Sequence, residues 1–376
     1  MAMTGYESLQ ILEPGDRAWT NGERLAAVVG PLLSWYEENA RILPWRERPE
    51  AYRVWVSEIM LQQTRVEAVK PYFQRFMEEL PTVRSLAEAS EDKLMKLWEG
   101  LGYYSRIRNM KRAAQIVVER WDGQMPASLE ELKKLPGIGS YTAGAIASFA
   151  FGIPAPAVDG NVMRVAARIM ADREDIGRQG TKTKVERLVA QVIPERRCGD
   201  FNQALIELGA TVCGPSGPPK CGQCPAASVC LARRLGLTDV IPVKEKKKPR
   251  RVEERTICLV EADGRLAVRK RPPTGLLASL YEFPNLEGRL SEAEAVKALG
   301  LRREQVEGCE RLPDAVHIFS HVEWHMCGYR IRIAGRGPKG YEMELPEELL
   351  EHYSIPEAFK VYKRAAFAAG GGKEKP

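Results

Sequence analysis

The sequence predicts a multidomain chain in which an all-α domain is followed by an α+β domain. Its 376 residues exceed what one hydrophobic core usually organises. From Asn21 to about Arg234, apolar residues recur with a helical period between proline and glycine breaks. From Thr256 onward, β-branched and aromatic segments alternate with turn residues and short helical stretches. These observations predict a helical domain over 1–236 and a mixed domain over 255–376.

Between these domains lies a polar, basic, proline-containing stretch that we interpret as a linker, residues 237–254. A charge run of this kind is more typical of a solvated tether than of a DNA site. The net charge of +6 is compatible with nucleic acid without requiring it. The sequence contains no long apolar run and its first residues lack the pattern of a signal peptide, so we expect no membrane contact and a cytoplasmic location.

The stretch KLPGIGSYTAGA, residues 134–145, places two glycines directly before a helix-compatible run. Gly137 and Gly139 allow a sharp turn that leaves backbone N–H groups uncovered, and Ser140 is placed to cap the helix. A turn of this kind can hold a phosphate at the positive end of the helix dipole. The same residues would also suit an ordinary connection between two helices.

Two carboxylates stand out in the helical half. In a helix, Glu58 shares its face with mainly apolar neighbours, which would raise its pKa and suit it to be a general acid. The alternative is a glutamate at the helix rim that pairs with Arg53 or Arg65. Asp159 in VDGNVMRV could simply be the N-cap of the next helix. Together they are the acid and the stabilising anion that cleavage of a glycosidic bond requires.

Four cysteines fall within eighteen residues, in the segment VCGPSGPPKCGQCPAASVC. A cytoplasmic protein keeps thiols reduced, so a metal or a metal cluster is favoured over disulfides. The spacing alone leaves zinc on four thiolates open. The cysteines are Cys213, Cys221, Cys224 and Cys230.

Taken together, these features resemble the MutY-type adenine DNA glycosylases of the endonuclease III superfamily, over nearly the whole chain. The resemblance is carried by LPWR (43–46), VSEIMLQQTRV (56–66), WEGLGYYSRIRN (98–109), LPGIGSYTAGAI (135–146), VDGNVMRV (158–165) and FNQALIELGA (201–210). It implies a helix-hairpin-helix fold and a [4Fe–4S] cluster on the four cysteines. Seven residues separate Cys213 from Cys221, where the family pattern has six.

The resemblance also implies site residues and a partner. The partner is double-stranded DNA with adenine opposite 8-oxoguanine or guanine, bound by a monomer at the bacterial nucleoid. Glu58 protonates the flipped adenine and assists attack on the sugar, and Asp159 stabilises the sugar cation. The supporting residues are Tyr141 and Asn161 beside these carboxylates, Trp45, Arg46 and Gln203 in the adenine pocket, Gln63 and Tyr103 entering the duplex, and Leu135, Gly137 and Gly139 gripping a backbone phosphate.

Position 141 separates two classes of relative. Bifunctional endonuclease III enzymes carry a lysine there, whose amine forms a Schiff base with the opened sugar. Tyr141 is a phenol and cannot do so, which indicates a monofunctional glycosylase that leaves an abasic site. A bifunctional glycosylase/lyase and a non-catalytic lesion-binding protein are the alternatives.

The C-terminal domain resembles the MutT-like, nudix-fold domain that reads 8-oxoguanine in this family. Phe319, Ser320 and His321 match the lesion-recognition motif. Only fragments of the magnesium-binding nudix motif are present, because Arg303 and Val306 occupy two of its glutamate positions. A nudix hydrolase with a helical DNA-binding arm is therefore disfavoured.

Overall fold

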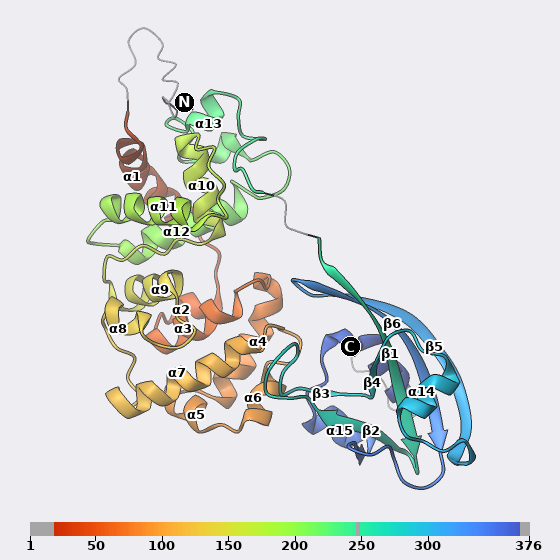
Figure 1. Ribbon diagram of the computed structural model, residues 1–376. Helices are drawn as coiled ribbons and strands as arrows, with labels where there is room; N and C mark the ends of the chain where they lie inside the picture. Colours follow the sequence, from red (N-terminus) through yellow and green to blue (C-terminus); the bar gives the residue numbers. More distant parts are fainter. Residues whose placement is uncertain (1–18, 246–248, 369–376) are drawn as a thin grey trace, which may run out of the picture. The chain divides into compact units, whose positions relative to one another are not determined.

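The computed structural model describes residues 19–245 and 249–368. Residues 1–18, 246–248 and 369–376 lie outside the described residues. They include the start of the predicted helical domain, three residues of the predicted linker and the end of the predicted mixed domain. The chain forms two compact units. The helical unit comprises Met1–Phe73 and Ile116–Lys246, and the sheet unit comprises Gln74–Gln115 and Lys247–Pro376. Figure 1 shows the course of the chain.

The helical unit is built from helices, as the sequence predicts from Asn21 to Arg234. Two further helices, α4 (Val66–Glu79) and α7 (Ser105–Trp121), run across the division between the units. The elements of the helical unit are α1 (Asn21–Asn39), α2 (Pro44–Glu47), α3 (Ala51–Met60), α8 (Leu129–Lys133), α9 (Ser140–Phe151), α10 (Gly160–Met170), α11 (Gln179–Val192), α12 (Cys198–Thr211), η1 (Cys221–Gln223) and α13 (Leu231–Arg234).

The core of the helical unit lies where α1, α10, α11 and α12 pack together. It includes Leu32, Val162 and Phe201, each at most 2% exposed. Helices α10 and α12 approach closely at Gly209, where an added Cβ would lie only 2.6 Å from Cβ of Asn161. This close approach holds the first turn of α10 against α12, and both helices contribute residues to the site described below.

In the sheet unit, one sheet has the strand order β3-β2-β1-β6-β5, with β4 paired to β1 and β7 to β2. The two long strands β1 and β6 are parallel, with Arg251 opposite Val322. The elements are β1 (Arg251–Ala262), β2 (Arg265–Lys270), β3 (Tyr281–Glu282), β4 (Asn285–Glu287), α14 (Glu292–Ala298), η2 (Arg303–Gln305), β5 (Val306–Ile318), β6 (Val322–Ile333), β7 (Glu342–Glu344), α15 (Pro346–His352), η3 (Glu357–Phe359) and α16 (Lys360–Ala368).

Each face of this sheet has its own core, which follows from the alternation of side chains along a strand. Ile257 and Trp324 pack with Phe359 on the face covered by α15 and α16. Cys258 and Ile331 pack with Val296 of α14 on the other face. The α+β domain expected from the sequence is thus a central sheet with α15 and α16 on one face and α14 on the other.

The helices α5 (Val83–Glu88) and α6 (Glu91–Leu97) belong to the sheet unit, although they lie inside the predicted helical domain 1–236. The ammonium of Lys96 donates to the backbone oxygen of Leu350 at 2.5 Å, and Lys363 pairs with Glu99 at 2.5 Å. Helical periodicity reveals that a segment is a helix but not which distant element it packs against, so the sequence could not place these helices.

Both ends of the predicted linker 237–254 are held by contacts among the described residues. Ile241 is 1% exposed and packs against Ala167 and Ala232, and its backbone oxygen accepts a hydrogen bond from Arg168 Nε at 2.7 Å. Strand β1 begins at Arg251, so the last four residues of the predicted linker belong to it. The interpretation as a solvated tether therefore does not hold at Ile241, which is buried, or from Arg251 onward, where the chain pairs in the sheet.

Among the described residues, no helix is both long enough and apolar enough to span a membrane.

Candidate active site

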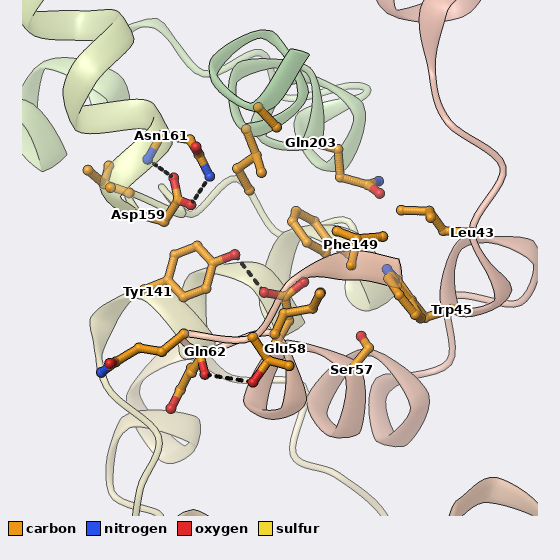
Figure 2. Close-up of a pocket in the computed structure, with 18 of the residues that line it drawn as sticks. Leu43, Trp45, Ser57, Glu58, Gln62, Tyr141, Phe149, Asp159, Asn161 and Gln203 are labelled. Atoms are coloured by element: carbon orange, nitrogen blue, oxygen red, sulfur yellow. Dashed lines mark hydrogen bonds between the residues drawn. The ribbon is translucent and has the colours of Figure 1, made fainter. Parts of the chain in front are cut away.

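The first component of the site is Glu58, near the end of α3. Eight of the ten residues of α3 are buried, so Glu58 is only 6% exposed. The hydroxyl of Tyr141 donates a hydrogen bond to Glu58 Oε2 at 2.6 Å (Figure 2). Burial raises the pKa of Glu58 to about 7, although the Tyr141 hydrogen bond and the charge of Arg46 oppose this shift. Glu58 is therefore a carboxyl group that can carry a proton at neutral pH.

Glu58 is not an exposed glutamate at the helix rim that pairs with Arg53. The guanidinium of Arg53 donates instead to the backbone oxygen of Pro44 at 3.0 Å and lies over the ring of Phe73. The apolar environment expected from the neighbours of Glu58 along α3 is confirmed, and its polar partner comes from α9.

The second component is Asp159, the N-cap of α10. Its Oδ1 accepts the backbone N–H groups of Asn161 and Val162 at 2.9 Å each, and its Oδ2 accepts the side-chain amide of Asn161 at 2.6 Å. Burial raises the pKa of Asp159, while these three N–H donors and the charge of Arg164 favour the anion. Asp159 is thus both a helix cap and a carboxylate held in a fixed orientation, so the two interpretations of this residue do not compete.

Both carboxylates face one open cleft of about 1420 Å³ in the helical unit. Figure 2 shows Glu58 and Tyr141 pointing toward each other, with Asp159 and Asn161 beside them and Trp45 and Gln203 farther along the wall. Helices α2, α3, α9, α10 and α12 supply much of the lining, and other helices and loops supply the rest. The cleft brings together eight residues proposed from the sequence: Trp45, Arg46, Glu58, Gln63, Tyr141, Asp159, Asn161 and Gln203.

The glycine hairpin is not part of the cleft lining. Gly137 has φ of +77°, a conformation that favours glycine, and Gly139 is the N-cap of α9. Leu135 is 3% exposed, so its side chain is part of the core. The expectation that Ser140 caps the helix is wrong: its hydroxyl donates to Glu186 Oε1 at 2.7 Å, because a residue of α11 packs beside it.

Four other predicted residues form a separate group in the sheet unit. Tyr103 is 46% exposed, and its hydroxyl lies 3.0 Å from Ser320 Oγ. The ring of Phe319 packs edge-on against Trp324, with centroids 5.0 Å apart, and Ser320 and His321 follow it at the turn between β5 and β6. The structure brings Tyr103 to the predicted lesion motif, from a distant part of the chain.

Gln63 and Tyr103, the two residues predicted to enter the duplex, share an unusual backbone conformation. Their φ angles are +60° and +48°. Such values are uncommon outside glycine and concentrate at functional sites. Each side chain is therefore presented from a turn that the surrounding structure must stabilise.

The four clustered cysteines line one small cavity in the helical unit, together with Arg168 and Arg233. None forms a disulfide. The guanidinium of Arg168 donates to Cys213 Sγ at 3.2 Å, and burial raises the pKa of Cys224 to about 11. Within residues 19–245 and 249–368, no three His, Cys, Asp or Glu side chains are arranged to hold one metal ion. Four free thiols around a shared cavity with a cationic wall nevertheless fit a thiolate-bound cluster.

The longer spacing between Cys213 and Cys221 is absorbed locally. The backbone N–H of Lys220 donates to the backbone oxygen of Val212 at 3.0 Å and closes the loop, and Gly217 turns within it at φ of +70°. The extra residue therefore lies in a closed loop and does not displace Cys221 from the cavity.

Sequence reasoning missed two buried charged residues. Arg164 is 7% exposed and donates to Asn161 Oδ1 at 2.8 Å and to the backbone oxygen of Cys213 at 2.7 Å. Glu207 is fully buried in α12 and binds two arginines. Arg164 lies in the motif VDGNVMRV and Glu207 in FNQALIELGA. A charged residue on an otherwise apolar helix face was the feature of the sequence that could have revealed them.

Two known protein families match separate parts of the chain. Residues 56–194 match the HhH-GPD superfamily of base excision DNA repair proteins, and residues 256–365 match the NUDIX domain. The chain is 38% identical to the adenine DNA glycosylase of Homo sapiens, over 84% of this chain and 68% of that protein. It is 32% identical to that of Buchnera aphidicola subsp. Schizaphis graminum, over 78% of this chain and 84% of that protein.

A solved structure gives the fold of the helical part. A trapped covalent intermediate of endonuclease III with DNA superposes with a TM-score of 0.50 at 22% identity, over 58% of this chain and all of that one. The helical part of the chain thus has the same fold as that enzyme.

Proposed function

The chain belongs to the adenine DNA glycosylase family, and from this premise we propose that it hydrolyses the N-glycosidic bond of adenine paired with 8-oxoguanine or guanine in double-stranded DNA. The product would be an abasic site with an intact strand. The observation that carries the proposal is the pair of carboxyl groups in one cleft, Glu58 with a pKa of about 7 and Asp159 held by three N–H donors. Hydrolysis of a glycosidic bond needs one group of each kind.

Glu58 would begin the reaction as the acid. Extruded adenine in the cleft presents ring nitrogens as acceptors, and proton transfer from Glu58 makes the base a neutral leaving group. The resulting carboxylate can then accept a proton from the attacking water. The Tyr141 hydroxyl donates to Glu58 and keeps its own proton, because burial raises the pKa of Tyr141 well above its ordinary value.

Asp159 would stabilise the positive charge that develops on the sugar as the bond breaks. Its three N–H donors orient the carboxylate before the charge appears, so little reorganisation is needed during the reaction. Asn161 contributes two of these donors and is itself held by Arg164.

The proposal includes a monofunctional outcome. Tyr141 occupies the position where a lyase would need an amine, and a phenol cannot form an imine. The cleft is also lined by Lys182, whose ammonium lies 3.6 Å from the carboxylate of Glu186. Lys182 is therefore an amine in the cleft whose participation has to be tested. Borohydride trapping tests this point, since a Schiff base would leave a covalent DNA adduct.

We further propose that the sheet unit reads 8-oxoguanine through Phe319, Ser320 and His321. Pyrophosphate hydrolysis is disfavoured, because an active nudix site carries its carboxylates along one helix. Here Glu294 lies in α14, which ends at Ala298, whereas Arg303 and Val306 lie in η2 and β5.

We assign a [4Fe–4S] cluster to Cys213, Cys221, Cys224 and Cys230. When bound, it would cross-link the loop after α12 to α13 and act as a structural anchor. Binding must release protons, because burial raises the pKa of the Cys224 and Cys230 thiols. Monomeric action and a cytoplasmic location at the nucleoid remain predictions.

One assay tests the main proposal. Duplexes carrying adenine opposite 8-oxoguanine, guanine or thymine are incubated with the protein and divided into untreated and alkali-treated samples. We expect breaks only after alkali, fastest opposite 8-oxoguanine, slower opposite guanine and negligible opposite thymine. Absence of alkali-labile sites in all three duplexes would refute the glycosylase, and breaks without alkali would indicate a lyase.

A further inference from the structure

A buried ion cluster lies behind the adenine cleft, centred on Glu207. Glu207 is fully buried in α12. Its carboxylate accepts hydrogen bonds from Arg41 Nε at 2.5 Å, Arg41 Nη2 at 3.2 Å and Arg46 Nη2 at 2.8 Å. A carboxylate removed from water costs several kcal/mol unless partners compensate it, and such pairs often stabilise less than apolar packing would. Its presence beside the cleft therefore points to a role other than fold stability.

The arginines of this cluster reach the cleft, whereas Glu207 does not. Arg41 and Arg46 both line the cleft, and Glu207 stands behind them. The guanidinium of Arg46 is held from three directions: by Glu207, by the backbone oxygen of Arg41 at 3.1 Å, and by the ring of Tyr36, 5.6 Å from its centroid. A guanidinium on a flexible side chain is thus fixed in one orientation.

We propose, on the basis of the function proposed above, that Glu207 is a positioning residue that fixes Arg46 against the adenine cleft and balances its charge there. Without Glu207 the like charges of Arg41 and Arg46 would repel each other. The guanidinium of Arg46 would then lose its fixed orientation, and no carboxylate would balance its positive charge. Misplacement of a substrate-facing group by about 1 Å can cost roughly 10²-fold in rate.

The charges around Glu58 and Glu207 determine the direction in which each substitution should move the pKa of Glu58. Tyr141, Asp159 and Arg46 act on Glu58, and the charge of Arg46 lowers its pKa. Around Glu207, burial raises the pKa but is outweighed by Arg41 and Arg46, so that the pKa is lowered and the group is an anion. Tyr36 faces the same cluster, near Asp200. From Coulomb's law we expect removal of the negative charge of Glu207 to lower the pKa of Glu58, and removal of Arg46 to raise it.

The test uses Glu207→Gln in the full-length protein, with single-turnover adenine excision measured from about pH 5.5 to 9. Glu58 acts in its protonated form, so excision falls as the pH rises through its pKa. We expect a roughly 10- to 100-fold lower maximal rate and an alkaline limb displaced to lower pH. Arg46→Gln should displace the same limb to higher pH. In the Arg46→Gln background, the further change Glu207→Gln should lower the maximal rate little more, because the side chain that Glu207 positions is absent.

Two more variants separate charge from packing. Glu207→Asp keeps the charge but shortens the reach, so we expect a lower rate with an unchanged limb. Asn202→Ser is the matched control, because Asn202 is equally buried in α12 and bonds Ser148 and the backbone of Ala155 and Ala157, away from Arg46. It should lower the melting temperature and leave the limb unchanged.

The outcomes are distinct. Failure of the wild-type protein to release adenine would refute the proposed function. An active wild type whose Glu207→Gln variant has an unshifted limb would refute the role of Glu207, as would an equal shift in Asn202→Ser. If Glu207→Gln is insoluble, the pair Glu207→Asp and Arg46→Gln decides: an upward shift in Arg46→Gln with none in Glu207→Asp supports the proposal, and any other combination overturns it.

Discussion

The two units place their proposed functional side chains in opposite environments. In the helical unit, Glu58 and Glu207 are buried and Tyr141 is half-buried, and burial raises the pKa values of Glu58 and Tyr141. In the sheet unit, Tyr103 is 46% exposed and Ser320 lies at a turn. Proton transfer benefits from a site with little water, whereas recognition of a base requires donors that the base can reach.

Each unit also contains one buried carboxylate that is bound by arginines, and the two can be compared directly. In the sheet unit Glu282 is 1% exposed and bonds Arg269, Arg271 and Asn285. Both arginines contact aromatic rings of the sheet unit, those of Tyr341 and Trp324. The arginines of Glu207 instead face the cleft. The same chemical unit therefore ties strands together in one case and presents a charge to a substrate in the other.

The largest expected effect is loss of the acid in the helical unit. Glu58→Gln keeps the shape of the side chain but cannot donate the proton, so excision should fall by at least ~10²–10⁴-fold. Binding to the duplex should change little, because the contacts to DNA are intact. Single-turnover kinetics and a binding titration measure the two properties. Near-normal turnover would remove Glu58 from the reaction.

Next in size is loss of a cysteine from the cavity. The purified wild type should be brown, with about four irons per chain. Cys221→Ser should lose iron and soluble yield, because the loop loses an anchor. Cys198→Ser, a buried cysteine of α12 outside the cavity, is the control and should keep its iron. Stoichiometric zinc without iron in anaerobically prepared wild type would overturn the cluster assignment.

The raised pKa of Glu58 also predicts a stability effect with a definite sign. The pKa of Glu58 is about 7 in the folded state, above its ordinary value of 4.5. Its contribution is favourable below about pH 4.5 and is lost as the pH rises through 7, when a buried group must ionise. Glu58→Gln should therefore be more stable than wild type at pH 9, by up to ~3 kcal/mol, and similar at pH 4.5. Denaturant unfolding at both pH values measures this, and equal differences at the two values would contradict the raised pKa.

The smallest expected effect concerns the exposed group of the sheet unit. Ser320→Ala should lower the preference for 8-oxoguanine over guanine by about tenfold or less, the size of one lost hydrogen bond. Ser291→Ala removes a serine that only caps α14 and is the control. The ratio of excision rates on the two duplexes is the measurement. An unchanged ratio in Ser320→Ala would mean that this exposed hydroxyl does not read the lesion.

Much of the fold was predictable because it is encoded locally. Helical periodicity between Asn21 and Arg234, the change of period after Thr256 and the N-cap at Asp159 are all visible within a few residues. The burial of Glu58 followed from the apolar side chains on its own helix face. The four cysteines could be grouped because they are close in sequence as well as in space.

What only the tertiary structure decided is which distant groups meet. The partner of Glu58 is Tyr141, 83 positions away, and Glu207 meets Arg41 across 166 positions. Helices α5 and α6 pack with residues of the C-terminal sheet unit. A sequence pattern reports the period and the burial of a segment, because these depend on neighbouring residues. The choice of a long-range partner depends on the packing of the whole core, and that choice determines the pKa of Glu58 and the orientation of Arg46.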